Sequence, residues 1–340
     1  MSAESEDEAP HPRATTALFG HAAAEQALLE AYRSGHMPHA WLIGGERGIG
    51  KATLAYRMAR FVLAHPDPGA ADVSAANSLF VDADHPVARR IAGRAHSDLL
   101  VLERTLNEKG RLRQDIAVDD VRRAIPFFGS TAGEGGWRIA IVDSLDELND
   151  AGANALLKIV EEPPPRALLL LVSHAPGRAL STIRSRCRRL TLRPLSTEDV
   201  ARAAATALDT SPDEPNLREA AEAADGSVAR ALMFLSGEAL AMRQEVLRLL
   251  DRLPQLDARA LHSLGDKLSG TEPTTLAAFM DTVDGWLSAR LAGRNLPDMA
   301  ALAQAFAAVH QSASDVDEYN LERKPFVFGV FNRLAEAMRA

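Results

Sequence analysis

The sequence predicts an α/β domain, in which helices cover both faces of a parallel sheet, followed by two all-helical domains. Short apolar runs alternate with helical patterns through the first two-thirds of the chain, which is typical of βα units. The runs are continuously apolar, as in strands covered on both faces. After Pro194 only helical patterns follow. We therefore expect a disordered acidic tail at residues 1–17, the α/β domain at 18–194, and helical domains at 195–237 and 238–340.

The α/β domain has four candidate strands, expected at residues 39–44, 98–103, 137–143 and 168–173. Its helices are expected at residues 51–63, from Asp119 onward, and at 151–162, where three prolines end the pattern. Residues 65–95 are rich in Pro, Gly, Asp and Ala and have no clean period. We interpret them as an insertion between the first helix and the second strand.

The first helical domain begins with a capping signal. In the run LSTEDV, Ser196 or Thr197 can cap a helix, and the helical pattern continues to about residue 236 with a polar break, DTSPDEPN. From residue 238 to the end, amphipathic segments alternate with short breaks. An amphipathic face looks alike whether it packs within the chain or against a partner.

Composition and charge limit the classes of function. With 46% hydrophobic and 25% charged residues, the chain is typical of a globular protein. Its densest apolar run is far shorter than the ~20 residues of a membrane helix, and its first residues do not resemble a signal peptide, so we expect a cytoplasmic protein. The net charge of −8 argues against binding nucleic acid over the whole surface, although a local basic patch remains open.

A glycine-rich loop follows the first candidate strand. Residues 45–51 read GERGIGK, in the strand–loop–helix order of a phosphate-binding loop. In such loops backbone N–H groups surround phosphate, the lysine reaches the β- and γ-phosphates, and the next residue is a Ser or Thr that binds Mg²⁺. Here Ala52 has that position, and Thr53 comes one residue late, turned by ~100° on a helix. The alternative is a tight turn that needs glycine only for its shape.

A candidate metal-associated carboxylate stands at the end of the third strand. Asp143 could hold a metal ion through water, but the residue after it is Ser144 instead of a Glu that would orient an attacking water. We interpret Asp146 and Glu147 as a solvated helix start. Ala52 and Ser144 both indicate weak or absent ATP hydrolysis.

Several motifs together resemble a known family. They are FGH at residues 19–21, the glycine loop, NALLKIVEEPPP at 154–165, and STIRSRC at 181–187 after LLLLVSHAP. They are similar to the clamp-loader subunits of bacterial DNA polymerase III, in the AAA+ class, densely over residues 18–194. The degenerate ATP motifs are closer to the delta-prime branch than to the ATP-hydrolysing gamma/tau branch.

The resemblance implies an α/β AAA+ P-loop domain, a small helical lid domain and an all-α C-terminal collar domain that builds a five-membered ring. It implies that Arg186, in the run Ser-Arg-Cys, is an arginine finger acting in trans on a neighbouring ATPase subunit. An arginine finger can raise the rate of nucleotide hydrolysis by ~10³- to 10⁵-fold. The alternative is that RSRCRR is a solvated basic turn.

The resemblance also implies a degenerate nucleotide site. Ser173 matches a sensor position, although it could instead cap its strand end, and Arg230 matches a second sensor one residue late, although it could be a surface arginine. The predicted nucleotide-site residues are Gly45, Gly48, Gly50, Lys51, Thr53, Asp143, Ser173 and Arg230. We expect no required cofactor, with weakly bound ATP or ADP as the open alternative.

Many relatives carry a four-cysteine zinc module after the first helix, but this chain has only Cys187. His65 and His85 alone do not make a zinc ligand set, so we predict no metal. Cys187 is interpreted as a small buried residue instead of a reactive thiol.

We therefore expect a non-motor clamp-loader subunit that helps load the sliding clamp onto primed DNA. The implied partners are the gamma/tau motor subunits and the delta subunit in a ring, with the clamp and primer-template DNA contacted through the complex. The chain would belong to a polymerase holoenzyme while having no polymerase activity and little or no ATPase activity of its own. The alternatives are an ATP-hydrolysing gamma/tau-like motor and a pure scaffold.

Overall fold

The computed structural model describes residues 10–107, 112–129, 133, 136–235, 239–269, 273–291, 296–319 and 321–339. The chain divides into two compact units, Met1–Ala229 and Arg230–Ala340. The predicted limits between three domains stay predictions, and the second of them, between residues 237 and 238, lies outside the described ranges.

The first unit is built on a five-stranded parallel sheet with the order β2-β3-β4-β1-β5. The strands are β1 (Ala40–Gly44), β2 (Leu99–Glu103), β3 (Arg138–Asp143), β4 (Ala167–Ser173) and β5 (Arg188–Thr191). The four predicted strands are confirmed to within one residue at each end. The edge strand β5 was not predicted, because RRLT is too short and too charged to be recognised as apolar.

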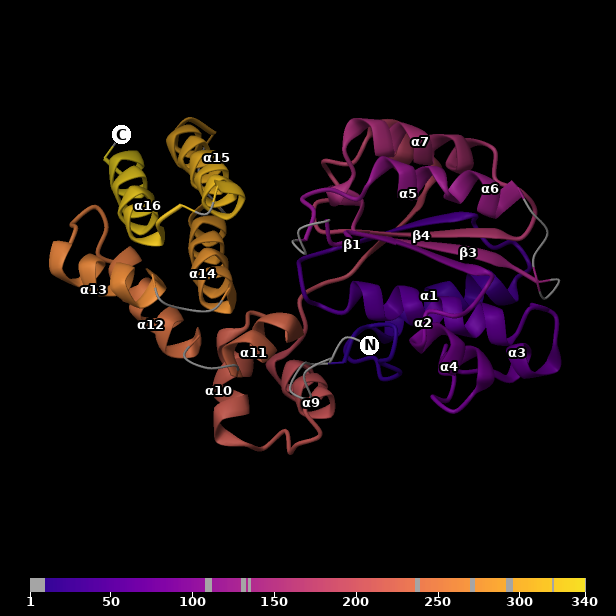
Figure 1. The fold of residues 1–340 in the computed structure, drawn as a ribbon. Helices are drawn as coiled ribbons and strands as arrows, with labels where there is room; N and C mark the ends of the chain where they lie inside the picture. Colours follow the sequence, from indigo (N-terminus) through magenta and orange to yellow (C-terminus); the bar gives the residue numbers. More distant parts are fainter. Residues whose placement is uncertain are drawn as a thin grey trace. The chain divides into compact units, whose positions relative to one another are not determined.

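Two layers of helices cover the sheet, one on each face. Successive side chains of a strand point to opposite faces, so each apolar strand contributes to both cores. Trp41 and Ile43 belong to the core under one layer, whereas Ala40 and Leu42 belong to the core under the other. The first layer contains α1 (Ala22–Arg33), α2 (Lys51–Ala64), α3 (Ala71–Ala75) and α4 (Pro86–Ala92). The second contains α5 (Val118–Arg122), α6 (Ala124–Gly129), α7 (Asp150–Glu161) and α8 (Ser181–Arg186). Figure 1 shows the sheet between these layers.

The predicted insertion at residues 65–95 contains the short helices α3 and α4. Its apolar residues Val73, Leu79 and Ile91 are buried in the core of the first layer. These helices have five and seven residues, which is too short for a helical period to be visible in the sequence.

The N-terminal segment at residues 10–17 lies on α2. Arg57 donates a hydrogen bond to the carbonyl of Thr16, and Arg60 donates to the carbonyls of Thr15 and Pro12. The predicted disordered tail therefore differs from the structure at residues 10–17, where buried arginines hold the backbone. Residues 1–9 lie outside the described ranges.

Helices α9 (Thr197–Ala207) and α10 (Pro215–Ala223) follow the sheet. Ser196, one of the two predicted caps, is the N-cap of α9, and its hydroxyl accepts a hydrogen bond from the N–H of Asp199 at 3.1 Å. Helix α11 (Val228–Leu235) begins at the boundary between the two units.

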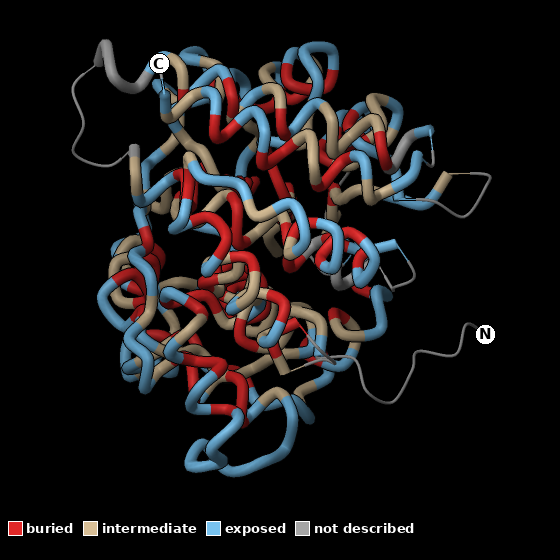
Figure 2. Tube along the Cα trace, turned by 90° about the vertical axis from the view of Figure 1, so that its left-hand side faces the viewer, coloured by how far each residue is buried: buried red, intermediate tan, exposed pale blue. Residues whose placement is uncertain are grey.

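Within the described ranges the second unit is helical, and it has its own apolar core. It contains α11 from Arg230 onward, followed by α12 (Ala239–Leu250), α13 (Ala258–Ser269), α14 (Pro273–Leu291), α15 (Leu296–Tyr319) and α16 (Arg323–Ala337). Phe279, Val330 and Phe331 lie fully buried at its centre. Along the helices of both units, buried and exposed stretches alternate in Figure 2, as amphipathic helices require.

Candidate functional site

The glycine loop lies where the sequence places it, between the end of β1 and the start of α2 at Lys51. Gly48 has a φ of +77°, a left-handed conformation that side chains disfavour. A Cβ at this position would collide with the Ser227 hydroxyl and the Ala229 side chain. The N–H of Ala229 also donates to the carbonyl of Gly48 at 3.3 Å. The start of α11 therefore packs directly on the loop.

His21, from the FGH motif, supports the same loop from another side. It is 6% exposed, and its Nε2 lies 2.6 Å from the carbonyl of Ile49. Burial is the main reason that the pKa of His21 is lowered. The sequence shows this residue only as part of a motif, because its contact with Ile49 depends on the fold.

Lys51 is turned toward its own loop. Its side chain is buried, and Nζ donates to the carbonyl of Gly45 at 2.7 Å and to the carbonyl of Glu46. Burial lowers the pKa of Lys51 to about 8, while Asp143 and Asp146 act in the opposite direction. The ammonium group that would meet phosphate is therefore engaged by loop carbonyls.

Asp143 ends β3 directly beside Glu103, the last residue of β2. Burial raises the pKa of Asp143 to about 6, with further contributions from the negative charges of Glu103 and Glu147. Lys51 and Arg47 oppose this shift. The structure thus brings Lys51 and Asp143 into one electrostatic environment at the C-terminal edge of the sheet.

Asp146 and Glu147 lie on a short 3-10 turn (Leu145–Glu147), and they are more than the solvated helix start that we expected. Asp146 is exposed, but its carboxylate accepts hydrogen bonds from the Ser173 hydroxyl at 3.0 Å and from the Ser144 hydroxyl at 3.1 Å. It also accepts from the N–H groups of His174 and Ala175. Asp146 therefore links the ends of β3 and β4 and engages the predicted sensor Ser173.

Glu147 connects the glycine loop to the end of β2. Its carboxylate lies 3.6 Å from Arg47 in the loop and 2.9 Å from Arg104. The Glu147 side chain is 15% exposed. Burial raises its pKa, and Arg104 and Arg47 oppose that effect. Sequence reasoning did not identify this set, because charge partners far apart in the chain leave no spacing signal.

Arg186 is the last residue of α8, which belongs to the second layer of helices, on the other face of the sheet from α2. Its side chain is 41% exposed. Nη2 lies 3.0 Å from Oε1 of Glu161, the last residue of α7, and Nη1 donates to the carbonyl of Thr182 at 3.0 Å. The cationic group is therefore held in place while still reaching solvent.

Arg230 belongs to the second unit and pairs there with Asp281 on α14. Nε lies 2.5 Å from one carboxylate oxygen, and Nη2 donates to the other at 3.1 Å. Its predicted role as a second sensor stays a prediction.

Thr53, one position after Ala52, is partly buried on α2.

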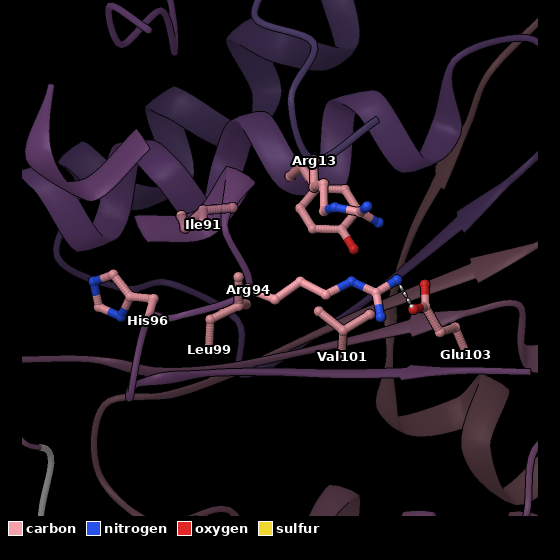
Figure 3. Close-up of a pocket in the computed structure, with 8 residues that line it drawn as sticks. Arg13, Ile91, Arg94, His96, Leu99, Val101 and Glu103 are labelled. Atoms are coloured by element: carbon pink, nitrogen blue, oxygen red, sulfur yellow. Dashed lines mark hydrogen bonds and ion pairs between the residues drawn. The ribbon is translucent and has the colours of Figure 1, made fainter. Parts of the chain in front are cut away.

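A cavity of about 180 Å³ lies between the N-terminal segment, α2, α4 and β2 (Figure 3). In it Arg94 donates to Glu103 at 2.5 Å. The lining residues are Arg13, Tyr56, Ile91, Arg94, His96, Leu99, Val101 and Glu103. Ile91 and Arg94 come from the predicted insertion, which therefore supplies part of the cavity wall.

Among the residues that the structure describes, no group of three or more His, Cys, Asp or Glu side chains is placed to hold a metal ion. None of the helices in those ranges combines the length and apolar character needed to cross a bilayer.

Comparison with known proteins assigns the family. The family model described as "DNA polymerase III, delta subunit" matches residues 20–196, more than half of the chain. The chain belongs to this family. The five-stranded parallel sheet with helices on both faces, and the helices that follow it, confirm the predicted α/β fold with a helical C-terminal region.

Curated relatives refine this family assignment. The chain is 38% identical to the DNA polymerase III subunit delta' of Pseudomonas aeruginosa over 149 residues, 44% of this chain and 41% of that protein. It is 31% identical to the subunit delta' of Escherichia coli over 169 residues, 50% of this chain and 46% of that protein. It is also 32% identical to the subunit gamma/tau of Mycobacterium tuberculosis over 170 residues, 49% of this chain and 26% of that protein.

The matched part of this chain thus spans less than half of each of these relatives. The family assignment and the relatives named delta' support the predicted delta-prime branch.

Proposed function

We propose that this chain is a non-motor subunit of a DNA polymerase III clamp loader, helping to load the sliding clamp onto primed DNA. In this proposal Arg186 acts in trans at the ATP site of a neighbouring subunit. The observation that carries the proposal is the contrast between two cations. Lys51 is buried and turned to its own loop, whereas Arg186 is held at a surface with its guanidinium accessible.

Arg186 suits this role chemically. A guanidinium is always charged and presents a planar fork that matches phosphate oxygens. A charge supplied from outside can stabilise the charge that develops on a transferring phosphoryl group. A position at the end of α8, partly exposed, is consistent with contact across a subunit interface.

The residues around Lys51 fit nucleotide only in part. The glycine loop, the start of α2 and Lys51 could hold phosphate groups if Lys51 exchanged its carbonyl partners for them. Position 52 offers no oxygen to Mg²⁺, because it is alanine. The Ser144 hydroxyl donates to Asp146 and supplies no carboxylate to orient water. We therefore propose weak binding of ATP or ADP without productive hydrolysis, and no required cofactor.

The proposed partners follow from the relatives. Proteins similar to this chain are named as subunits delta' and gamma/tau of DNA polymerase III. We propose that the chain joins gamma/tau and delta subunits in a cytoplasmic ring through residues 238–340. The clamp and the DNA would be contacted through that complex.

The first test is ATP turnover by the reconstituted loader, stimulated by clamp and primed DNA. We expect Arg186→Ala to lower kcat by ~10³-fold or more, as expected for an arginine finger. We expect Lys51→Ala to leave turnover within about twofold, because the proposal places no hydrolysis at its loop. Size-exclusion chromatography of each complex controls for assembly.

The similarity to a gamma/tau subunit supports one alternative function, an ATP-hydrolysing motor subunit with an unusual glycine loop. A large loss of turnover in Lys51→Ala would favour that motor. Normal turnover in both assembled variants would leave only a scaffold role.

A further inference from the structure

The structure assigns a positioning residue to the proposed finger. We propose that Glu161 orients the Arg186 guanidinium for the phosphates of a nucleoside triphosphate bound by the neighbouring subunit. This inference rests on the proposed function. It concerns a residue of another helix, 25 positions before Arg186 in the sequence.

Three acceptors surround the guanidinium. Oε1 of Glu161 lies 3.0 Å from Nη2, the Thr182 carbonyl accepts from Nη1 at 3.0 Å, and the Ser185 hydroxyl lies 3.4 Å from Nη1. The second and third acceptors belong to α8, the same helix as Arg186. Among the residues that the structure describes, Glu161 is the acceptor that contacts the guanidinium from outside that helix.

The two helices that carry Glu161 and Arg186 are fixed by packing. Glu161 is the last residue of α7, and the proline run 163–165 that follows Glu162 prevents the helix from continuing. Helices α7 and α8 share one core, in which Ile159 and Ile183 are buried. The distance between Glu161 and Arg186 is therefore set by packed elements rather than by a mobile loop.

The position of Glu161 is electrostatically unfavourable for helix α7 itself. A negative charge at the C-terminus of a helix is unfavourable, because the helix dipole is negative there. Residues that break a local rule are expected where a specific contact compensates for it. Here the compensating contact is with Arg186.

Glu161 can orient Arg186 without blocking it. Both side chains are partly exposed, at 45% and 41%, and ion pairs in solvent are weak. A guanidinium carries five N–H groups, so contacts through Nη1 and Nη2 leave donors for a second acceptor. An arginine that is already ordered loses less side-chain entropy when it meets phosphate.

The test uses the reconstituted loader, with clamp- and DNA-stimulated ATP turnover as the readout. We expect Glu161→Ala to lower kcat about 3- to 10-fold, as estimated from the side-chain entropy of one arginine, with an unchanged KM for ATP. Glu161→Gln retains an oxygen that can accept from Nη2 and should restore kcat to within about twofold of the unmodified chain. Glu162→Ala removes the same charge from the neighbouring residue and should have no effect.

A double variant separates positioning from a general effect on the fold or the interface. Combined with Arg186→Ala, Glu161→Ala should cause no further loss of turnover. A further loss there, or a Glu161→Ala variant with unchanged or raised kcat, would overturn the positioning role. If Arg186→Ala itself leaves kcat unchanged, the proposed function fails; if only Glu161→Ala is silent, the positioning role fails and the finger stands.

Discussion

Individual charged residues at the C-terminal edge of the sheet have pKa values that are shifted by their surroundings. Asp143 is partly buried beside Glu103, and Lys51 is buried against loop carbonyls. The sequence predicted that both lie at this edge, because β1 and β3 are parallel and end there. It could not predict their altered pKa values, which depend on burial and on charges brought together by folding.

For Asp143 the pH dependence has a definite sign. Its pKa in the folded chain, about 6, lies above the ~3.9 of an unfolded Asp, so the folded state binds this proton more tightly. Stability from this group is present below about pH 4 and is lost as pH rises to about 6. We expect Asp143→Asn to increase the free energy of unfolding at pH 7.5 by about 1–3 kcal/mol.

Urea unfolding of the full chain at pH 7.5 and at pH 4 measures this effect. The gain should be nearly absent at pH 4, where the unmodified carboxyl group is protonated in the folded state. A variant that is less stable than the unmodified chain at pH 7.5, or equally stabilised at both pH values, contradicts the assignment.

At the scale of elements, the sequence predicts what depends on periodicity and misses what depends on contacts. Continuous apolar runs identified four strands, and a Ser cap identified the start of α9. The edge strand β5, the 3-10 turn at Leu145–Glu147 and the ion pairs of Glu147 and Glu161 were missed. In each case the stabilising partner comes from a distant part of the chain.

The contact between α1 and α2 contains a buried ion pair with a measurable contribution to stability. Nε of Arg57 lies 2.5 Å from Oε1 of Glu25, and both side chains are at most 10% exposed. Removing the arginine leaves a buried carboxylate, so Arg57→Met should lower the free energy of unfolding by about 3 kcal/mol. Adding Glu25→Gln should recover part of this loss.

Urea unfolding followed by circular dichroism compares these variants with a matched exposed pair. Arg89 pairs with Asp84 at 2.9 Å, with side chains 66% and 87% exposed. Arg89→Met should change stability by less than about 1 kcal/mol. Equal losses in Arg57→Met and Arg89→Met would mean that burial does not determine the contribution of the pair.

At the scale of the whole molecule, charge and the division into units are the features that bear on partners. The net charge is −8, and the second unit has a core of its own. The sequence indicated an all-helical C-terminal region, but it could not identify which faces are buried within the chain.

The charge predicts weak binding of DNA by the isolated chain. Affinity for the phosphate backbone depends on neutralisation by Lys and Arg, and here acidic residues outnumber them, 46 to 38. We expect a Kd for primer-template DNA above about 10 µM near 0.15 M salt. Fluorescence anisotropy measures it, with the reconstituted loader as the positive control. Submicromolar binding by the isolated chain would contradict this prediction.

The edge strand β5 also has a consequence for handling the protein. Edge strands can pair with strands of other copies, which leads to aggregation. β5 has only four residues, and Arg188 and Arg189 are exposed on it. Short length and positive charge discourage such pairing at high concentration. Neutralising both arginines should therefore reduce solubility during expression even if the fold is unchanged.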